Sequence, residues 1–145
     1  MTKTSPATIT GLLAIAGLLA ACGQAEEKPG EVETFAAISE DETISLLGTE
    51  PFWSMAIVED TLTYMSPDNL EGVSTDVTRF TGNNGLGISG ELEGEALQIA
   101  ITPGDCSDAM SERNYPYTVT VTWGERQLNG CGYTDKQPFT GEIAP

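Results

Sequence analysis

The chain has 145 residues, of which 22 are acidic and 6 are basic, and it carries a formal net charge of −16 at pH 7 with no histidine. This length fits one small domain, and the excess of negative charge excludes nucleic acids as partners of its surface while it favours cationic proteins. Without histidine the chain has no Ser–His or Cys–His dyad, and no Cys-x-x-Cys spacing predicts a zinc site.

The amino-terminal segment is typical of an export signal. An apolar run over residues 9–21 follows Lys3, and it is shorter than the roughly 20 residues that a membrane-spanning helix needs. The run ends in Leu-Ala-Ala-Cys, which resembles the lipobox of bacterial lipoproteins. The resemblance implies cleavage before Cys22, a diacylglyceryl thioether on its sulfur and a fatty acid such as palmitate on its amino group.

We therefore predict a lipoprotein signal peptide over residues 1–21 and a membrane anchor through the acyl chains on Cys22. Because Gly23 is not aspartate, the sorting rule of enteric lipoproteins implies the outer membrane, facing the periplasm. Residues 22–42 are rich in Glu, Ala, Pro and Gly, which predicts an acidic flexible linker. Within this linker, residues 35–38 are apolar enough for a short helical turn or for docking on the domain edge.

Short β-strands dominate the pattern of the predicted domain, residues 43–145. Large apolar residues recur at every second position over residues 53–58 and 97–102, and most regularly over 117–123, where they alternate with threonines. Asn83-Asn84-Gly85 is a strong turn signal between two such segments. The glycine-rich residues 86–92 predict a bulged or edge strand, and residues 107–113 allow one helical turn.

These segments predict an all-β fold, a small antiparallel meander of about 7–8 strands closed into a barrel or packed as a sandwich. Trp53 and Trp123 fall at inward positions of strands, and we expect both in the core. We expect Met110 to fill a gap there as well. Cys106 and Cys131 form an even pair in a chain predicted to be exported, which predicts one disulfide.

Three blocks contain the least common residue combinations in the domain. They are residues 48–53 (Gly-Thr-Glu-Pro-Phe-Trp), residues 106–117, which begin Cys-Ser-Asp-Ala-Met-Ser and end Tyr-Pro-Tyr, and residues 128–132 (Leu-Asn-Gly-Cys-Gly). Together they resemble a family of small bacterial envelope lipoproteins of unknown function. The resemblance implies a β-rich domain outside the cytoplasm and assigns no activity. The domain has a weaker likeness to META-type heat-shock lipoproteins and to the membrane-bound inhibitor of c-type lysozyme, although it has no counterpart to the basic loop of that inhibitor.

The same blocks supply a predicted ligand- or partner-binding patch. Its members are Glu50, Phe52, Trp53, Asp108, Arg113, Tyr115 and Tyr117. Arg113 can hold a carboxylate in two parallel hydrogen bonds, either that of Glu50 or Asp108 or that of a ligand. Asp108 can also cap a turn.

We expect a lipid-anchored envelope protein whose domain binds a protein, a cell-wall fragment or a small ligand, with no catalysis, cofactor or metal ion. Glu91, Glu93 and Glu95 share strand parity, but no calcium-loop sequence accompanies them, and a solvated face is the simpler interpretation. Two alternatives stay open. One is an inhibitor of a cationic wall-lytic enzyme such as lysozyme, attracted by opposite charge, and the other is a passive structural or stress protein.

Overall fold

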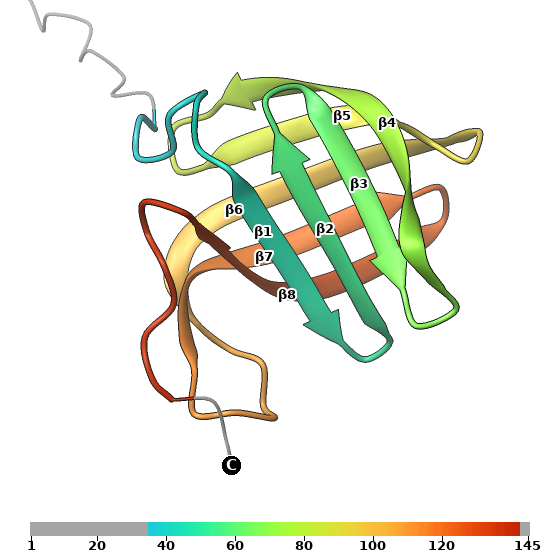
Figure 1. The fold of residues 1–145 in the computed structure, drawn as a ribbon. Helices are drawn as coiled ribbons and strands as arrows, with labels where there is room; N and C mark the ends of the chain where they lie inside the picture. The colour runs from blue at the N-terminus through green and yellow to red at the C-terminus, as the bar shows by residue number, and fades with distance from the viewer. Residues whose placement is uncertain (1–34, 143–145) are drawn as a thin grey trace, which may run out of the picture. The chain divides into compact units, whose positions relative to one another are not determined.

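The computed structural model describes residues 35–142, and eight strands in this range form one closed antiparallel barrel (Figure 1). In chain order the strands are β1 (Ile44–Thr49), β2 (Phe52–Val58), β3 (Thr61–Ser66), β4 (Asn69–Thr81), β5 (Leu86–Leu92), β6 (Glu95–Ser107), β7 (Asn114–Trp123) and β8 (Arg126–Thr134). Each strand pairs with its neighbours in the chain, and β8 returns to pair with β1. The all-β prediction is confirmed, and the closure selects the barrel over the sandwich. Within the same residues, no helix is long and apolar enough to cross a bilayer.

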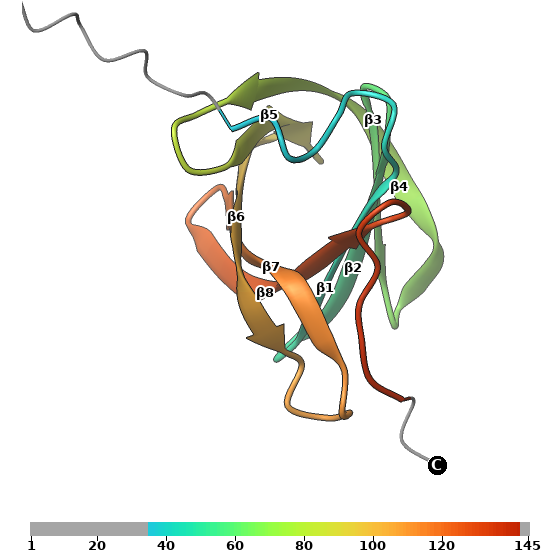
Figure 2. The same ribbon diagram turned by 90° about the vertical axis from the view of Figure 1, so that its left-hand side faces the viewer.

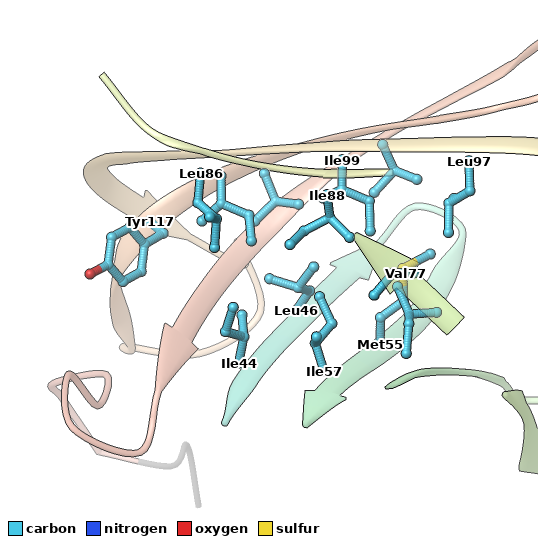
Figure 3. Packing of buried hydrophobic residues seen from close by; sticks show 14 of the residues in the cluster. Ile44, Leu46, Met55, Ile57, Val77, Leu86, Ile88, Leu97, Ile99 and Tyr117 are labelled. Atoms are coloured by element: carbon cyan, nitrogen blue, oxygen red, sulfur yellow. The ribbon is translucent and has the colours of Figure 1, made fainter. Parts of the chain in front are cut away.

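The interior of the barrel is apolar because alternate residues of every strand point inward. On β6, for example, Leu97, Ile99 and Ile101 are each at most 2% exposed, whereas the residues between them are exposed. Figure 2 shows the ring of strands, and Figure 3 shows side chains from several strands pointing toward one another inside it. Trp53 and Trp123 are 4% and 2% exposed, which confirms that both belong to the core.

Two local predictions are wrong. Strand β5 is neither bulged nor at an edge, since it pairs with β4 and β6 in unbroken register. The pairing irregularities lie between Tyr64 and Ser66 and between Pro103 and Cys106 instead. Residues 108–113 form an irregular loop between β6 and β7 and make no helical turn.

The predicted disulfide is confirmed. Cys106 near the end of β6 is bonded to Cys131 of β8, so the bond joins the two strands that flank β7. The separation of 25 residues corresponds to about 3.5 kcal/mol in the chain-entropy treatment of cross-links. The bond also holds the loop that follows β6 close to β8.

Residues 35–42, the last part of the predicted linker, pack against the barrel. Ile38 is 5% exposed within the core, and the carboxylate of Glu42, which is 4% exposed, accepts hydrogen bonds from Ser39 and from the hydroxyl of Thr134. Phe35–Glu42 therefore packs on the barrel immediately ahead of residue 43, where the predicted β-domain begins. The predicted signal peptide, Cys22 and the linker up to residue 34 lie outside the described residues.

Two cations, Arg79 and Lys136, hold residues 39–42 against the barrel. Arg79 donates hydrogen bonds to the backbone carbonyls of Ser39 and Glu42, at 3.4 and 3.5 Å, and Lys136 pairs with Asp41 at 2.7 Å. The contacts come from β4 and from the chain after β8, so the segment links two parts of one rim of the barrel.

Replacing Gly48 with alanine is expected to destabilise the barrel. An ideal Cβ at this position would overlap the indole nitrogen of Trp53, whereas a Cβ at Gly104 would lie 3.6 Å from the Thr118 methyl group, an ordinary contact. We expect G48A to lower the free energy of unfolding by about 1–3 kcal/mol, the usual effect of overpacking, and G104A to change it by at most about 0.5 kcal/mol. Urea unfolding followed by tryptophan fluorescence measures both, and equal midpoints would contradict this packing of Trp53.

Candidate functional site

An open groove of about 530 Å³ lies on the outward side of β1, β2 and β3, the strands nearest the viewer in Figure 1. Leu47, Phe52 and Met65 contribute to its floor, and it is bordered by the β3–β4 turn and by the loop after β6. Among the described residues, five large apolar side chains are more than half exposed, and three of them line this groove: Phe52 (54%), Leu70 (78%) and Met110 (62%). We name it the Phe52 groove.

Because side chains alternate along β2, the neighbouring residues Phe52 and Trp53 point in opposite directions. Phe52 points outward, whereas Trp53 points into the barrel and closes the groove from below. The indole ring occupies space left free by the absent side chains of Gly48 and Gly130, which face it from β1 and β8. No described residue accepts a hydrogen bond from its buried Nε1–H. Two glycines from separate sequence blocks therefore allow Trp53 to lie beneath the groove.

Asp108 organises the loop that borders the groove. Its carboxylate accepts hydrogen bonds from the backbone N–H groups of Met110 and Ser111, from the Ser111 hydroxyl and from the Tyr115 hydroxyl, all within 3.0 Å. Burial raises the pKa of Asp108, but these hydrogen bonds outweigh that effect and lower its pKa to about 2. The predicted turn cap is thus confirmed. The Asp108 carbonyl also accepts a hydrogen bond from Thr49 Oγ1 at 3.3 Å, which connects the loop to β1.

Arg113 and Tyr115 support the loop from behind. Tyr115 is 1% exposed, and its ring lies 5.5 Å from that of Phe139 and 6.0 Å from that of Tyr133. The guanidinium of Arg113 lies 4.3 Å from the centre of the Phe139 ring. The two ion pairs within residues 35–142 join Arg126 to Glu95 and Lys136 to Asp41, so the predicted pairing of Arg113 with Glu50 or Asp108 is not formed.

The seven residues of the predicted patch are therefore not all neighbours. Phe52, Trp53 and Asp108 line the Phe52 groove. Glu50 is exposed in the β1–β2 turn, beside two lining residues, Thr49 and Phe52.

Tyr117 belongs to the barrel interior rather than to this surface. It is 1% exposed and part of the core cluster. Burial raises the pKa of Tyr117, and the negative charge of Glu42 raises it further. The ring therefore packs inside the barrel, and it does not face the groove.

Among the lining residues that the predicted patch lacks are three apolar ones, Met65, Leu70 and Met110. Met110 was predicted in the core but is 62% exposed, because the loop that carries it leaves the sheet after β6. Met65 and Leu70 did not stand out either. The available signal was Leu70 itself, an apolar residue within a run of turn formers, Pro-Asp-Asn-Leu-Glu.

The groove carries negative charge and no cation. Asp108 is the charged residue among those that line it, and Glu50 and Asp68 are exposed in the turns that border it. The four cations of the described chain lie elsewhere: Arg79 and Lys136 hold residues 39–42, and the other two, Arg113 and Arg126, stack on Phe139 and Trp123. In residues 35–142 no group of three or more side chains is arranged to hold a metal ion.

No protein-family model, curated protein or solved structure matches this chain.

The lowered pKa of Asp108 predicts an acid-dependent loss of stability. Because its pKa is about 2 in the folded chain and 3.8 when unperturbed, its ionised form stabilises the fold above about pH 4, and this contribution disappears as pH falls toward 2. We expect the free energy of unfolding to fall by about 1 kcal/mol more in the wild type than in D108N over this range, a value reduced for partial solvent screening. Glu42 is common to both proteins and cancels in the comparison. Parallel pH profiles from chemical unfolding would contradict the assignment.

Proposed function

We propose that this chain is a lipid-anchored, non-catalytic binding protein of the bacterial cell envelope, and that its partner is a cationic protein that docks in the Phe52 groove. The observation that carries the proposal is the gathering of three exposed apolar side chains, Phe52, Leu70 and Met110, around one hollow. Contiguous exposed apolar surface rimmed by polar residues is a usual mark of a protein-binding site.

The charge around the groove supports a cationic partner. Asp108 is ionised at neutral pH, and Glu50 and Asp68 add negative charge at the rim. Within residues 35–142 none of these three carboxylates forms an ion pair. An anionic partner would be repelled, whereas a basic one would be attracted at a rate that falls with ionic strength. The partner segment that fits combines apolar anchors with lysine or arginine.

The non-catalytic part of the proposal rests on composition. The chain contains no histidine, and the ionised carboxylate of Asp108 is fully used in holding its loop. The envelope location rests on the lipobox-like residues 19–22 and on the disulfide, which persists in an oxidising compartment.

A synthetic amphipathic peptide of leucine and lysine tests the docking site, with a leucine and glutamate peptide of the same pattern as its control. We expect the full chain to bind the lysine peptide, and we expect L70S and F52S each to weaken binding about tenfold, because each removes an apolar anchor. V58S is the matched control, since Val58 is 51% exposed on β2 but does not line the groove.

Fluorescence anisotropy of the labelled peptide measures the affinities at low and high salt. Equal binding by L70S, F52S and V58S would place the site elsewhere. Equal binding of the glutamate peptide, or binding that salt does not weaken, would contradict the cationic partner.

A second candidate, inhibition of a cationic wall-lytic enzyme such as lysozyme, is favoured by the same acidic rim. In this case the full chain slows the enzyme at low salt, high salt relieves the effect, and F52S reduces it. A lysozyme rate that the protein does not change at low salt rejects this candidate and leaves the general binding role in place.

The anchor has its own test. In a bacterial host we expect the protein to enter the membrane fraction with the mass of a chain that begins at a lipidated Cys22, whereas C22A carries no lipid and keeps the mass of the uncleaved chain. A cytosolic wild-type precursor with reduced Cys106 and Cys131 would overturn the proposed location.

A further inference from the structure

A second groove, of about 470 Å³, lies on the outward side of β5, β6 and β7, and it shares no lining residue with the Phe52 groove. We name it the Phe80 groove, after the one aromatic residue among those that line it. The residues that give it polar character are Asn84, Ser89, Gln98, Thr102, Thr120 and Thr122.

Phe80 presents one face of its ring to solvent. It lies opposite Gly87 in the β4–β5 pair, and an ideal Cβ built on Gly87 would overlap the ring, so the ring lies directly over the glycine backbone. The side chain is nevertheless 58% exposed. One face thus packs on β5, which holds the ring in place, and the other is free for stacking.

Neutral hydrogen-bonding groups lie next to this ring. Strand register places Ser89, Gln98 and Thr122 in one row across β5, β6 and β7, directly beside the row that contains Gly87, Ala100 and Thr120. The side chains of Ser89, Gln98, Thr120 and Thr122 make no hydrogen bond within residues 35–142. Their hydroxyl and amide groups are therefore free to bind a ligand.

The groove has no charged lining residue in a chain whose net charge is −16. A cationic ligand finds no carboxylate in it, and an anionic ligand finds no cation and is repelled by the whole chain. A purely apolar ligand would cover the amide of Gln98 without replacing its bonds to water. The ligand that matches has an apolar face, several hydroxyl groups and no charge.

We propose that the Phe80 groove binds a neutral glycan. The C–H face of one pyranose ring stacks on the exposed face of Phe80, and the hydroxyl groups of the adjoining sugar unit, which lies over the strands, form hydrogen bonds with Gln98, Ser89 and Thr122. The Phe80 groove shares no lining residue with the Phe52 groove, so glycan binding here does not depend on a protein partner binding there.

Titration of the full chain with neutral tetrasaccharides tests the proposal by calorimetry. The two probes are β-1,4-linked N-acetylglucosamine, the amino sugar of cell walls, and β-1,4-linked glucose. We expect a Kd of about 1 mM or tighter for at least one of them. Preference for the first identifies an amino-sugar glycan as the ligand, and equal affinity identifies neutral β-glycans in general.

Variants locate the binding. F80A is expected to weaken affinity about tenfold, because it removes the stacking surface, whereas F80W retains binding. F80A also uncovers Gly87 and can weaken the fold, so a second variant is needed. A100I keeps Phe80 but fills the centre of the groove, and we expect it to lose binding. V58A is the control, because Val58 is 51% exposed and lines neither groove. No binding of either tetrasaccharide at about 10 mM, or equal binding by wild type, F80A and A100I, overturns the proposal.

Discussion

Pairing of β8 with β1 is the constraint on which the rest of the structure depends. Four residue pairs, from Ile44↔Thr134 to Leu47↔Cys131, close the sheet and leave none of the eight strands as an edge. Gly48 faces the Trp53 indole through the β1–β2 register, and the β8–β1 pairing adds Gly130 of β8 as a second glycine against the same ring. Closure thereby brings together sequence blocks that lie about 80 residues apart. The disulfide of Cys106 and Cys131 adds the third block, the loop after β6, to the same end of the barrel.

The distribution of charge follows from this architecture. Acidic residues concentrate in turns and loops, where Glu50, Asp68 and Asp108 are examples, and the outward sides of β6 and β7 between them carry threonine, alanine and glutamine. The molecule is therefore strongly acidic at its loops and neutral on parts of its wall. The two grooves differ for this reason: one lies among acidic loops and suits a basic partner, and the other lies on neutral strands and suits an uncharged ligand.

Much of the fold could be predicted because strand alternation is a local signal. The threonine-rich pattern of residues 117–123 corresponds to β7, and the even pair of cysteines forms the disulfide. The prediction for the glycine-rich β5 was wrong because a glycine in a strand can indicate either a bulge or the close approach of a neighbouring side chain. The local sequence pattern does not distinguish these two cases. At Gly87 the neighbour is Phe80, seven residues earlier in the chain. Met110 was misplaced because its loop has no period from which a direction can be inferred.

The sequence by itself determined the class of fold, the inward direction of Trp53 and Trp123 and the acidity of the surface, because each depends on composition or on the twofold period of a strand. Only the tertiary structure decided which exposed side chains lie together. Phe52 begins β2, Leu70 lies at the start of β4 and Met110 lies in the loop after β6. Pairing of β3 with β2 and β4 brings the first two together, and barrel closure brings the loop of Met110 next to them. It also divided the predicted patch, since Tyr117 fills the interior while Phe52 remains at the surface. The period of a strand shows that a side chain points outward, but its neighbours there depend on register and on loop paths, which contacts far apart in the chain determine.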